Sequence, residues 1–233
     1  MPGSTLLSGR RFCQRPNRAV YAGILFDLDG VLVDSRVAIA RSMNHALATL
    51  GLESWPEETL YGLIGPPLHD AFSEVLSAQA ADLALTDACV ARYRERYRTA
   101  CVEETRPVEG IAEALEALAA AGRALAVATS KPVEFAGPIL ETLGLAGSFR
   151  AVVGPALEAR SEPKTATVGR ALAALGVRGP CAMVGDRLHD VLAGRAHGLA
   201  TVGVTWGIGS AAELREAGAD HLVDRPAELV ALL

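Results

Sequence analysis

Two aspartates that follow an apolar run near the start of the chain are the residues most able to do chemistry. Residues 24–26 are apolar and lead into Asp27-Leu28-Asp29-Gly30. Because side chains alternate along an extended strand, Asp27 and Asp29 point to the same side, a few Å apart. Two carboxylates that close together repel each other, so their placement requires a compensating interaction or a function. The stretch alone fits an Asp-Gly turn of a β-hairpin equally well.

Two further polar groups follow apolar runs later in the chain. Thr129-Ser130-Lys131 comes after residues 124–128, and Asp186 comes after residues 181–185 with Asp190 four positions on. Helix capping explains each group taken singly. In an open α/β sheet, however, the carboxyl ends of the strands form the ligand crevice, and here three of them carry hydroxyl or carboxylate groups. The joint pattern predicts a site at that edge.

Short apolar runs alternate with helical patterns over most of the chain. Continuous rather than alternating hydrophobicity is typical of parallel strands that helices cover on both faces. The six predicted strands are residues 19–28, 124–129, 149–153, 181–185, 200–205 and 221–223. The predicted helices between them are residues 110–121, 133–143, 165–175, 191–197 and 211–217. This order predicts an α/β fold with a doubly wound parallel sheet.

One interval breaks the strand-helix rhythm. The first predicted strand ends near residue 29 and the next begins only near residue 124, far beyond an ordinary crossover. We expect an inserted α-helical cap domain over residues 37–105, with helices at 37–50, 57–63, 68–77 and 80–99. The α/β core then comprises residues 20–36 and 106–233, with hinges near 33–37 and 105–107. Residues 1–19, rich in Arg, Ser, Gly and Pro, are expected to form a disordered tail.

Composition narrows the class of protein. Of the 233 residues, 50% are hydrophobic and 21% charged, which is typical of a folded globular chain. The net charge of −5 gives no basic footprint for nucleic acid. No apolar stretch reaches the roughly 18 residues of a membrane span. The four cysteines lack CxxC spacing and the five histidines lack zinc spacing, so we expect free thiols and a cytoplasmic protein.

These motifs resemble those of the haloacid dehalogenase (HAD) superfamily. The likeness is carried, in order, by residues 27–35 (DLDGVLVDS), Thr129-Ser130-Lys131, Lys164 and residues 185–190 (GDRLHD). It spans residues 20–233, and the chain is most similar to phosphoglycolate phosphatase-like hydrolases. The segments around residues 65–68 and 204–209 carry that closer likeness.

The resemblance implies a role for each motif residue. Asp27 would attack a phosphoryl group to give an aspartyl-phosphate, and Asp29 would act as general acid and base. Thr129 would donate its hydroxyl to the phosphoryl group, helped by the backbone N–H of Ser130. Lys164 stands where the family has its phosphate-neutralising lysine, although here proline precedes the lysine rather than following it. Lys131 is a nearby competitor for that role.

The resemblance also implies a cation. Two carboxylates and an anionic substrate repel, at about 5 kcal/mol for each unit pair about 3.5 Å apart in an effective dielectric of about 20. Mg²⁺ is the expected cofactor, bound by Asp27, the backbone carbonyl of Asp29 and Asp186. Asp190 would support the site or assist the metal.

The cap is expected to close over the crevice and to contact the leaving group of a small phosphorylated metabolite. Predicted lining residues are Arg41 and His45 on the first cap helix and the turn at residues 66–68, with Pro67 at its centre. The alternating arginines at 92, 94, 96 and 98 most simply form a solvated helix face, with anion binding as the alternative.

Several other functions stay open at this stage. A dehalogenase needs only one aspartate in the first motif, so Asp29 favours phosphoryl chemistry. A sugar phosphomutase, a nucleotidase or a pyrophosphatase of the same fold remains possible, as does a non-catalytic receiver-like signalling module. The sequence leaves open which phosphomonoester is used and whether the protein is a monomer or a homodimer.

Overall fold

A six-stranded parallel sheet forms the centre of the core. The computed structural model describes residues 21–159 and 162–233, so the predicted tail at 1–19 lies outside the described residues. The strands are β1 (Gly23–Phe26), β4 (Ala124–Ala128), β5 (Ala151–Val153), β6 (Cys181–Gly185), β7 (Ala200–Val204) and β8 (His221–Val223). Their order is β5-β4-β1-β6-β7-β8, and every pairing is parallel. The doubly wound α/β prediction is confirmed, and β1 lies in the middle of the sheet.

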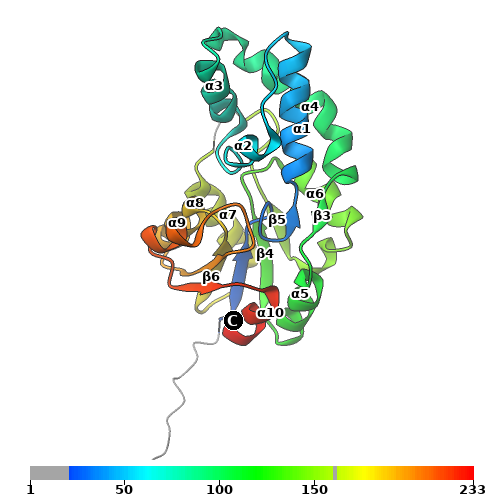
Figure 1. Cartoon of the computed structure of the whole chain (residues 1–233). Coiled ribbons are helices and arrows are strands. Elements are labelled where there is room, and N and C mark those ends of the chain that lie inside the picture. The colour runs from blue at the N-terminus through cyan, green and yellow to red at the C-terminus, as the bar shows by residue number, and fades with distance from the viewer. Residues whose placement is uncertain (1–20, 160–161) are drawn as a thin grey trace, which may run out of the picture.

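Helices cover both faces of this sheet (Figure 1). The core helices are α5 (Ile111–Ala120), α6 (Val133–Thr142), α7 (Lys164–Leu175), α8 (Leu188–Ala196), α9 (Ala211–Glu216) and α10 (Pro226–Leu232), with the short turn η2 (Ala146–Ser148). Leu25 packs with α7 and α8 residues on one face. Ile24 and Phe26 point to the other face, which holds α5, α6 and α10. The alternation of a strand between two helical layers thus explains its unbroken hydrophobicity.

The helices of the interval in which we expect the cap, residues 37–105, stand above the core in Figure 1 and are called the cap below. Its helices are α1 (Arg36–Thr49), α2 (Glu57–Tyr61), α3 (Leu68–Ala78), the short turn η1 (Leu83–Leu85) and α4 (Thr86–Glu103). The last predicted cap helix starts six residues late because Asp82 accepts a hydrogen bond from the Ala84 N–H, which forms a separate turn. The most extensive packing within the cap is that of α1 against α4, which lie side by side.

The two connections between cap and core pair with each other. Strand β2 (Val33–Asp34) runs antiparallel to β3 (Arg106–Pro107), with Val33 opposite Pro107. The sequence did not predict this ribbon, because strands of two residues carry no periodicity. The hinge proposed for these two segments stays a prediction, but they do lie together at the base of the cap.

Within the described ranges, no helix is both long and apolar enough to cross a bilayer. Cys89, Cys101 and Cys181 carry free thiols, and the first two are buried.

Candidate active site

A tight turn at the end of β1 sets the position of Asp27 and Asp29. The Asp27 N–H donates to the Val184 carbonyl at 2.9 Å, which continues the pairing of β1 with β6. The chain then turns back, and the Gly30 N–H donates to the Val33 carbonyl at 2.8 Å. Gly30 has a φ of +80°, a conformation that glycine adopts without strain. The turn is not a hairpin of the main sheet, since β1 pairs in parallel with β4 and β6.

Three buried carboxylates meet beside this turn. One oxygen each from Asp27, Asp186 and Asp190 lie within 4.8 Å of one another. The Lys164 ammonium lies 2.7 Å from Asp27 Oδ1 and 2.8 Å from Asp190 Oδ1. Pro163 precedes α7 and Lys164 is its first residue, so the helix start aims the lysine at the cluster. The structure therefore places Lys164 beside Asp27 despite the unusual position of the proline.

Burying three carboxylates side by side is electrostatically unfavourable, and this changes the pKa values of the cluster. Burial, together with the neighbouring Asp190, raises the pKa of Asp27 to about 7, even though Lys164 opposes the rise. Burial, with Asp190 and Asp27 nearby, also raises the pKa of Asp186 well above its usual value. Burial alone would lower the pKa of Lys164, but contact with Asp190 and Asp27 outweighs it and raises that pKa. One lysine thus offsets only part of the negative charge.

This donor set fits a hard divalent cation. Asp186 Oδ2 accepts the Ile208 N–H at 2.7 Å. Asp186 Oδ1 is buried and has no hydrogen-bond partner in the part of the chain that the structure describes. A buried carboxylate oxygen without a partner is costly unless it binds a cation. All three candidate ligands are carboxylates, the ligand type that Mg²⁺ prefers.

Glycines leave the space that Asp186 needs. A Cβ on Gly30 would lie 2.2 Å from Asp186 Oδ2, and one on Gly207 would lie 2.4 Å from the same oxygen. Larger residues at either position would displace the carboxylate. Our sequence reasoning gave Gly30 and Gly207 no role in the site, although the first belongs to the DLDG motif and the second to the segment 204–209.

Asp29 has a separate set of partners. The Lys131 ammonium donates to Asp29 Oδ1 at 2.7 Å, and the Ser35 hydroxyl donates to the same oxygen at 2.5 Å. Ser35 is at the N-cap position of α1, yet its side chain makes no capping hydrogen bond because the hydroxyl is directed to Asp29. Lys131 and Lys164 therefore do not compete for one partner, since Lys131 pairs with Asp29 and Lys164 pairs with Asp27.

The loop after β4 brings hydroxyl groups to the same edge. Thr129 is buried, and its Oγ1 accepts the Lys131 N–H at 3.0 Å. Thr129 and Ser130 both line the cavity that contains Asp27 and Asp29. The sequence-predicted group around the DLDG motif is thus assembled from the ends of β1, β4 and β6 and the start of α7.

A cavity of about 130 Å³ lies between this edge and the cap. The predicted turn contributes Pro66, Pro67 and Leu68 to its wall. The rest of the cap side is formed by Tyr93, Arg94 and Tyr97 of α4, by His69 and Ala71 of α3, and by apolar residues of α1 and of the turn. The cap therefore gives the cavity a mostly apolar wall.

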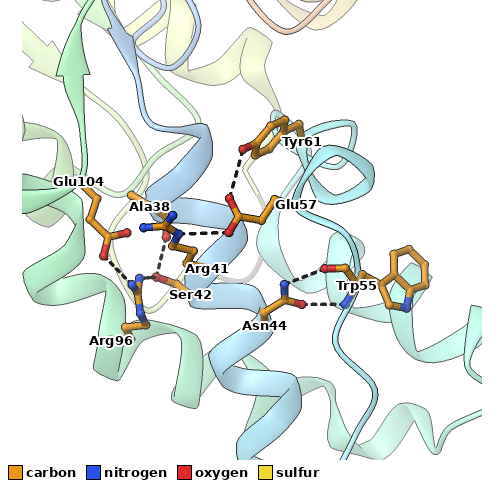
Figure 2. Close-up of polar contacts among 9 residues, drawn as sticks. All are labelled: Ala38, Arg41, Ser42, Asn44, Trp55, Glu57, Tyr61, Arg96 and Glu104. Atoms are coloured by element: carbon orange, nitrogen blue, oxygen red, sulfur yellow. Dashed lines mark hydrogen bonds and ion pairs between the residues drawn. The ribbon is translucent and has the colours of Figure 1, made fainter.

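Arg41 and His45 are not part of this wall. Among the described residues, α1 contributes Ile39 and Met43 to the cavity. Successive residues on a helix are about 100° apart, so Arg41 and His45 lie on the side opposite to those two. Arg41 is half exposed and donates from Nε to Glu57 at 3.1 Å (Figure 2). The prediction that Arg41 and His45 line the cavity is therefore wrong.

The four alternating arginines have different surroundings. Arg92 pairs with Glu95 on the surface, and Arg96 bonds Ser42 and Glu104, as Figure 2 shows. Arg94 lines the cavity and has no acidic partner or hydrogen bond among the described residues. The solvated-face interpretation is therefore wrong for Arg94, because residues two positions apart on a helix point about 200° apart, so the four arginines do not share one face.

Comparison with known proteins gives a consistent picture. The family model for haloacid dehalogenase-like hydrolases matches residues 24–204. A 5'-nucleotidase of Pseudomonas aeruginosa is 39% identical over 84% of this chain and 87% of its own length. A phosphoglycolate phosphatase of Agrobacterium fabrum is 34% identical over 78% of this chain and 80% of its own. The crystal structure of a predicted phosphatase from Clostridium acetobutylicum superposes with a TM-score of 0.84, at 33% identity, covering 91% of this chain and 98% of that one.

Proposed function

The chain belongs to the haloacid dehalogenase-like hydrolase family, and we propose that it is a Mg²⁺-dependent phosphatase that hydrolyses a small phosphomonoester through an aspartyl-phosphate intermediate. The observation that carries the proposal is that two carboxylates of one turn have different interaction partners. Asp27 pairs with Lys164, whereas Asp29 pairs with Lys131 and Ser35. Two neighbouring carboxylates with different partners are suited to different roles in one reaction.

In the first step, an oxygen of Asp27 attacks phosphorus and the bond to the leaving oxygen breaks. Asp29 gives its proton to that oxygen, so the leaving group departs as a neutral alcohol. Lys164 lies beside Asp27 and neutralises charge on the phosphoryl group, and Thr129 offers it a hydroxyl donor.

In the second step, Asp29 takes a proton from a water that attacks the aspartyl-phosphate. Phosphate leaves and Asp27 is restored. Asp27, Asp186 and Asp190 would hold Mg²⁺, which supplies the positive charge that lets the anionic nucleophile approach the anionic phosphoryl group.

The cap side of the cavity supports a small substrate with a second anionic group. A volume of about 130 Å³ is below the range of about 300 to 1,000 Å³ found for pockets that hold drug-sized ligands. Arg94 is a cation at the cavity wall without an acidic partner in the described ranges. Guanidinium groups bind carboxylates through paired hydrogen bonds. A short phosphomonoester that carries a carboxylate, such as phosphoglycolate, meets both conditions.

A nucleoside monophosphate is the second candidate. The relative with 39% identity is named a 5'-nucleotidase, and Tyr93 lines the cavity together with Tyr97 and Phe135. Aromatic walls suit a planar base. A nucleoside needs more room than the cavity offers, so this substrate requires the cap to move outward.

The test is phosphate release by the purified protein from a panel that contains phosphoglycolate, nucleoside monophosphates, pyrophosphate, sugar phosphates and p-nitrophenyl phosphate. We expect activity only with Mg²⁺ present, and the highest kcat/KM for phosphoglycolate. A nucleotide in first place would favour the second candidate. No release from any compound would overturn the phosphatase proposal and favour a non-catalytic module.

A further inference from the structure

A cap tyrosine reaches the core beside the acid-base carboxylate. Tyr97 lies on α4 and is buried, with 1% of its surface exposed. The ammonium of Lys131 donates to the Tyr97 hydroxyl at 2.5 Å and to Asp29 Oδ1 at 2.7 Å. One nitrogen atom thus joins the cap helix to the carboxylate that handles the proton.

Aromatic packing fixes the tyrosine ring from both sides. Tyr93, one turn earlier on α4, stacks on Tyr97 with centroids 4.9 Å apart. Phe135 of the core helix α6 meets the ring edge-on, with centroids 5.1 Å apart. The ring therefore bridges cap and core, and the position of its hydroxyl depends on how the cap sits on α6.

The carboxylate has few other restraints. Asp29 Oδ1 accepts from Lys131 and from Ser35, and Ser35 stands at the N-cap position of α1 where the chain enters the cap. Lys131 is 8% exposed and carries a long flexible stem, which needs a second partner to hold one direction. Tyr97 is that partner.

We propose that Tyr97 is a positioning residue that acts through Lys131 to orient the Asp29 carboxylate toward the leaving oxygen when the cap is seated on the core. The proposal rests on the phosphatase function proposed above. Tyr97 contributes no proton to the reaction. Its hydroxyl accepts a hydrogen bond from Lys131, so the lysine side chain is held where it contacts Asp29.

Leaving-group dependence distinguishes this role from a structural one. Phenolate is a stronger base than p-nitrophenolate, so phenyl phosphate needs proton donation by Asp29 more than p-nitrophenyl phosphate does. The two substrates have nearly the same shape, which keeps cavity contacts matched. The ratio kcat/KM reports the first step, in which Asp29 gives up its proton.

The experiment compares Tyr97→Phe, Lys131→Gln and the wild type on both substrates with Mg²⁺. Tyr97→Phe keeps the ring packing and removes only the hydroxyl. We expect kcat/KM to fall about 10-fold for phenyl phosphate and about 2-fold or less for p-nitrophenyl phosphate, a part of the roughly 100-fold or more that general acid catalysis supplies. Lys131→Gln should show the same preference with larger losses.

Tyr61→Phe is the matched control, because it removes a cap tyrosine hydroxyl that bonds Glu57 instead of a core residue (Figure 2). It should leave the ratio of the two substrates unchanged. Equal losses on both substrates for Tyr97→Phe, or losses that follow a lower melting temperature, would overturn the positioning role while leaving the phosphatase function intact. A wild type that hydrolyses neither of these substrates nor any other compound of the panel would overturn both proposals.

Discussion

The core side and the cap side of the cavity are built on different principles. On the core side, charged groups form short ion pairs, such as those of Lys164 with Asp27 and Asp190. On the cap side, the wall is apolar and Arg94 has no partner in the described part of the chain. The strand ends of a packed sheet fix the positions of the side chains that follow them. The residues with which a separate helical domain lines the cavity can change without moving those side chains. The comparison supports the proposal that the core carries out the chemistry and that the cap selects the substrate.

The largest expected effect tests the core side of the comparison. Asp27→Asn should lower kcat about 1,000-fold or more, because an amide is a poor nucleophile toward phosphorus. Phosphate release from p-nitrophenyl phosphate measures the loss, and circular dichroism checks the fold. Asp70→Asn, on the exposed face of α3, should retain activity. Turnover retained by Asp27→Asn would exclude this aspartate as nucleophile.

The metal requirement tests the carboxylate cluster. Asp186→Asn should raise the Mg²⁺ concentration for half-maximal activity about 10-fold or more, because the variant loses a charged ligand beside Asp27 and Asp190. Calorimetric titration with Mg²⁺ alone should show the same weakening without any turnover. Unchanged Mg²⁺ affinity in both measurements would remove Asp186 from the proposed ligand set.

Arg94 tests the cap side. Arg94→Gln should raise KM for phosphoglycolate about 10-fold, with less than about a 2-fold change for p-nitrophenyl phosphate, because only the first carries a carboxylate for the guanidinium. Arg92→Gln is the control, since Arg92 lies on the same helix but pairs with Glu95 at the surface. If both substrates respond equally, Arg94 does not select the leaving group.

The smallest expected effect concerns stability without metal. The pKa of Asp27 is raised from 3.8 to about 7, so the folded protein holds a proton there that the unfolded chain has lost above pH 4. The wild type should therefore lose stability as pH rises from about 4 to 7. In chelator, Asp27→Asn should be more stable than the wild type by about 1 to 3 kcal/mol above pH 7.

The difference in free energy of unfolding between the two proteins should vanish as the pH falls toward 4, because protonated Asp27 and Asn carry the same charge. Urea titrations at pH 5 and 8 measure it. A difference that does not change with pH would show that the buried charge of Asp27 is not the cause. If Asp27→Asn is more stable but inactive, the carboxylate cluster lowers the stability of the fold in exchange for activity.

Sequence patterns predicted the sheet better than its surroundings. The strands at residues 181–185 and 221–223 have the predicted bounds, because a buried strand leaves an unbroken apolar run. The sequence did not predict the ribbon of β2 and β3 or the helix α10. All three elements are short, and the segments that they contact are far away in the sequence. Short elements depend on tertiary contacts more than on local propensity.

The site shows the same division. The spacing of Asp27 and Asp29 and the polar groups after later strands pointed to the crevice, because parallel strands present their carboxyl ends at one edge. Arg41 and His45 were placed wrongly, because the register of α1 against the cavity depends on how the helix packs, and Ile39 and Met43 face inward. The tyrosines at 93 and 97 share one face of α4, a helical spacing that could have marked them as inward residues.

By itself the sequence determined the α/β core, the inserted cap and the residues at the strand ends, since hydrophobic periodicity and motif spacing are local properties of the chain. The tertiary structure decided which lysine serves which aspartate. Only the pairing of β4 with β1 places Lys131 beside Asp29, and only the packing of α7 against the sheet places Lys164 beside Asp27. Contacts between side chains so far apart in the sequence depend on tertiary packing, and local sequence patterns do not predict them.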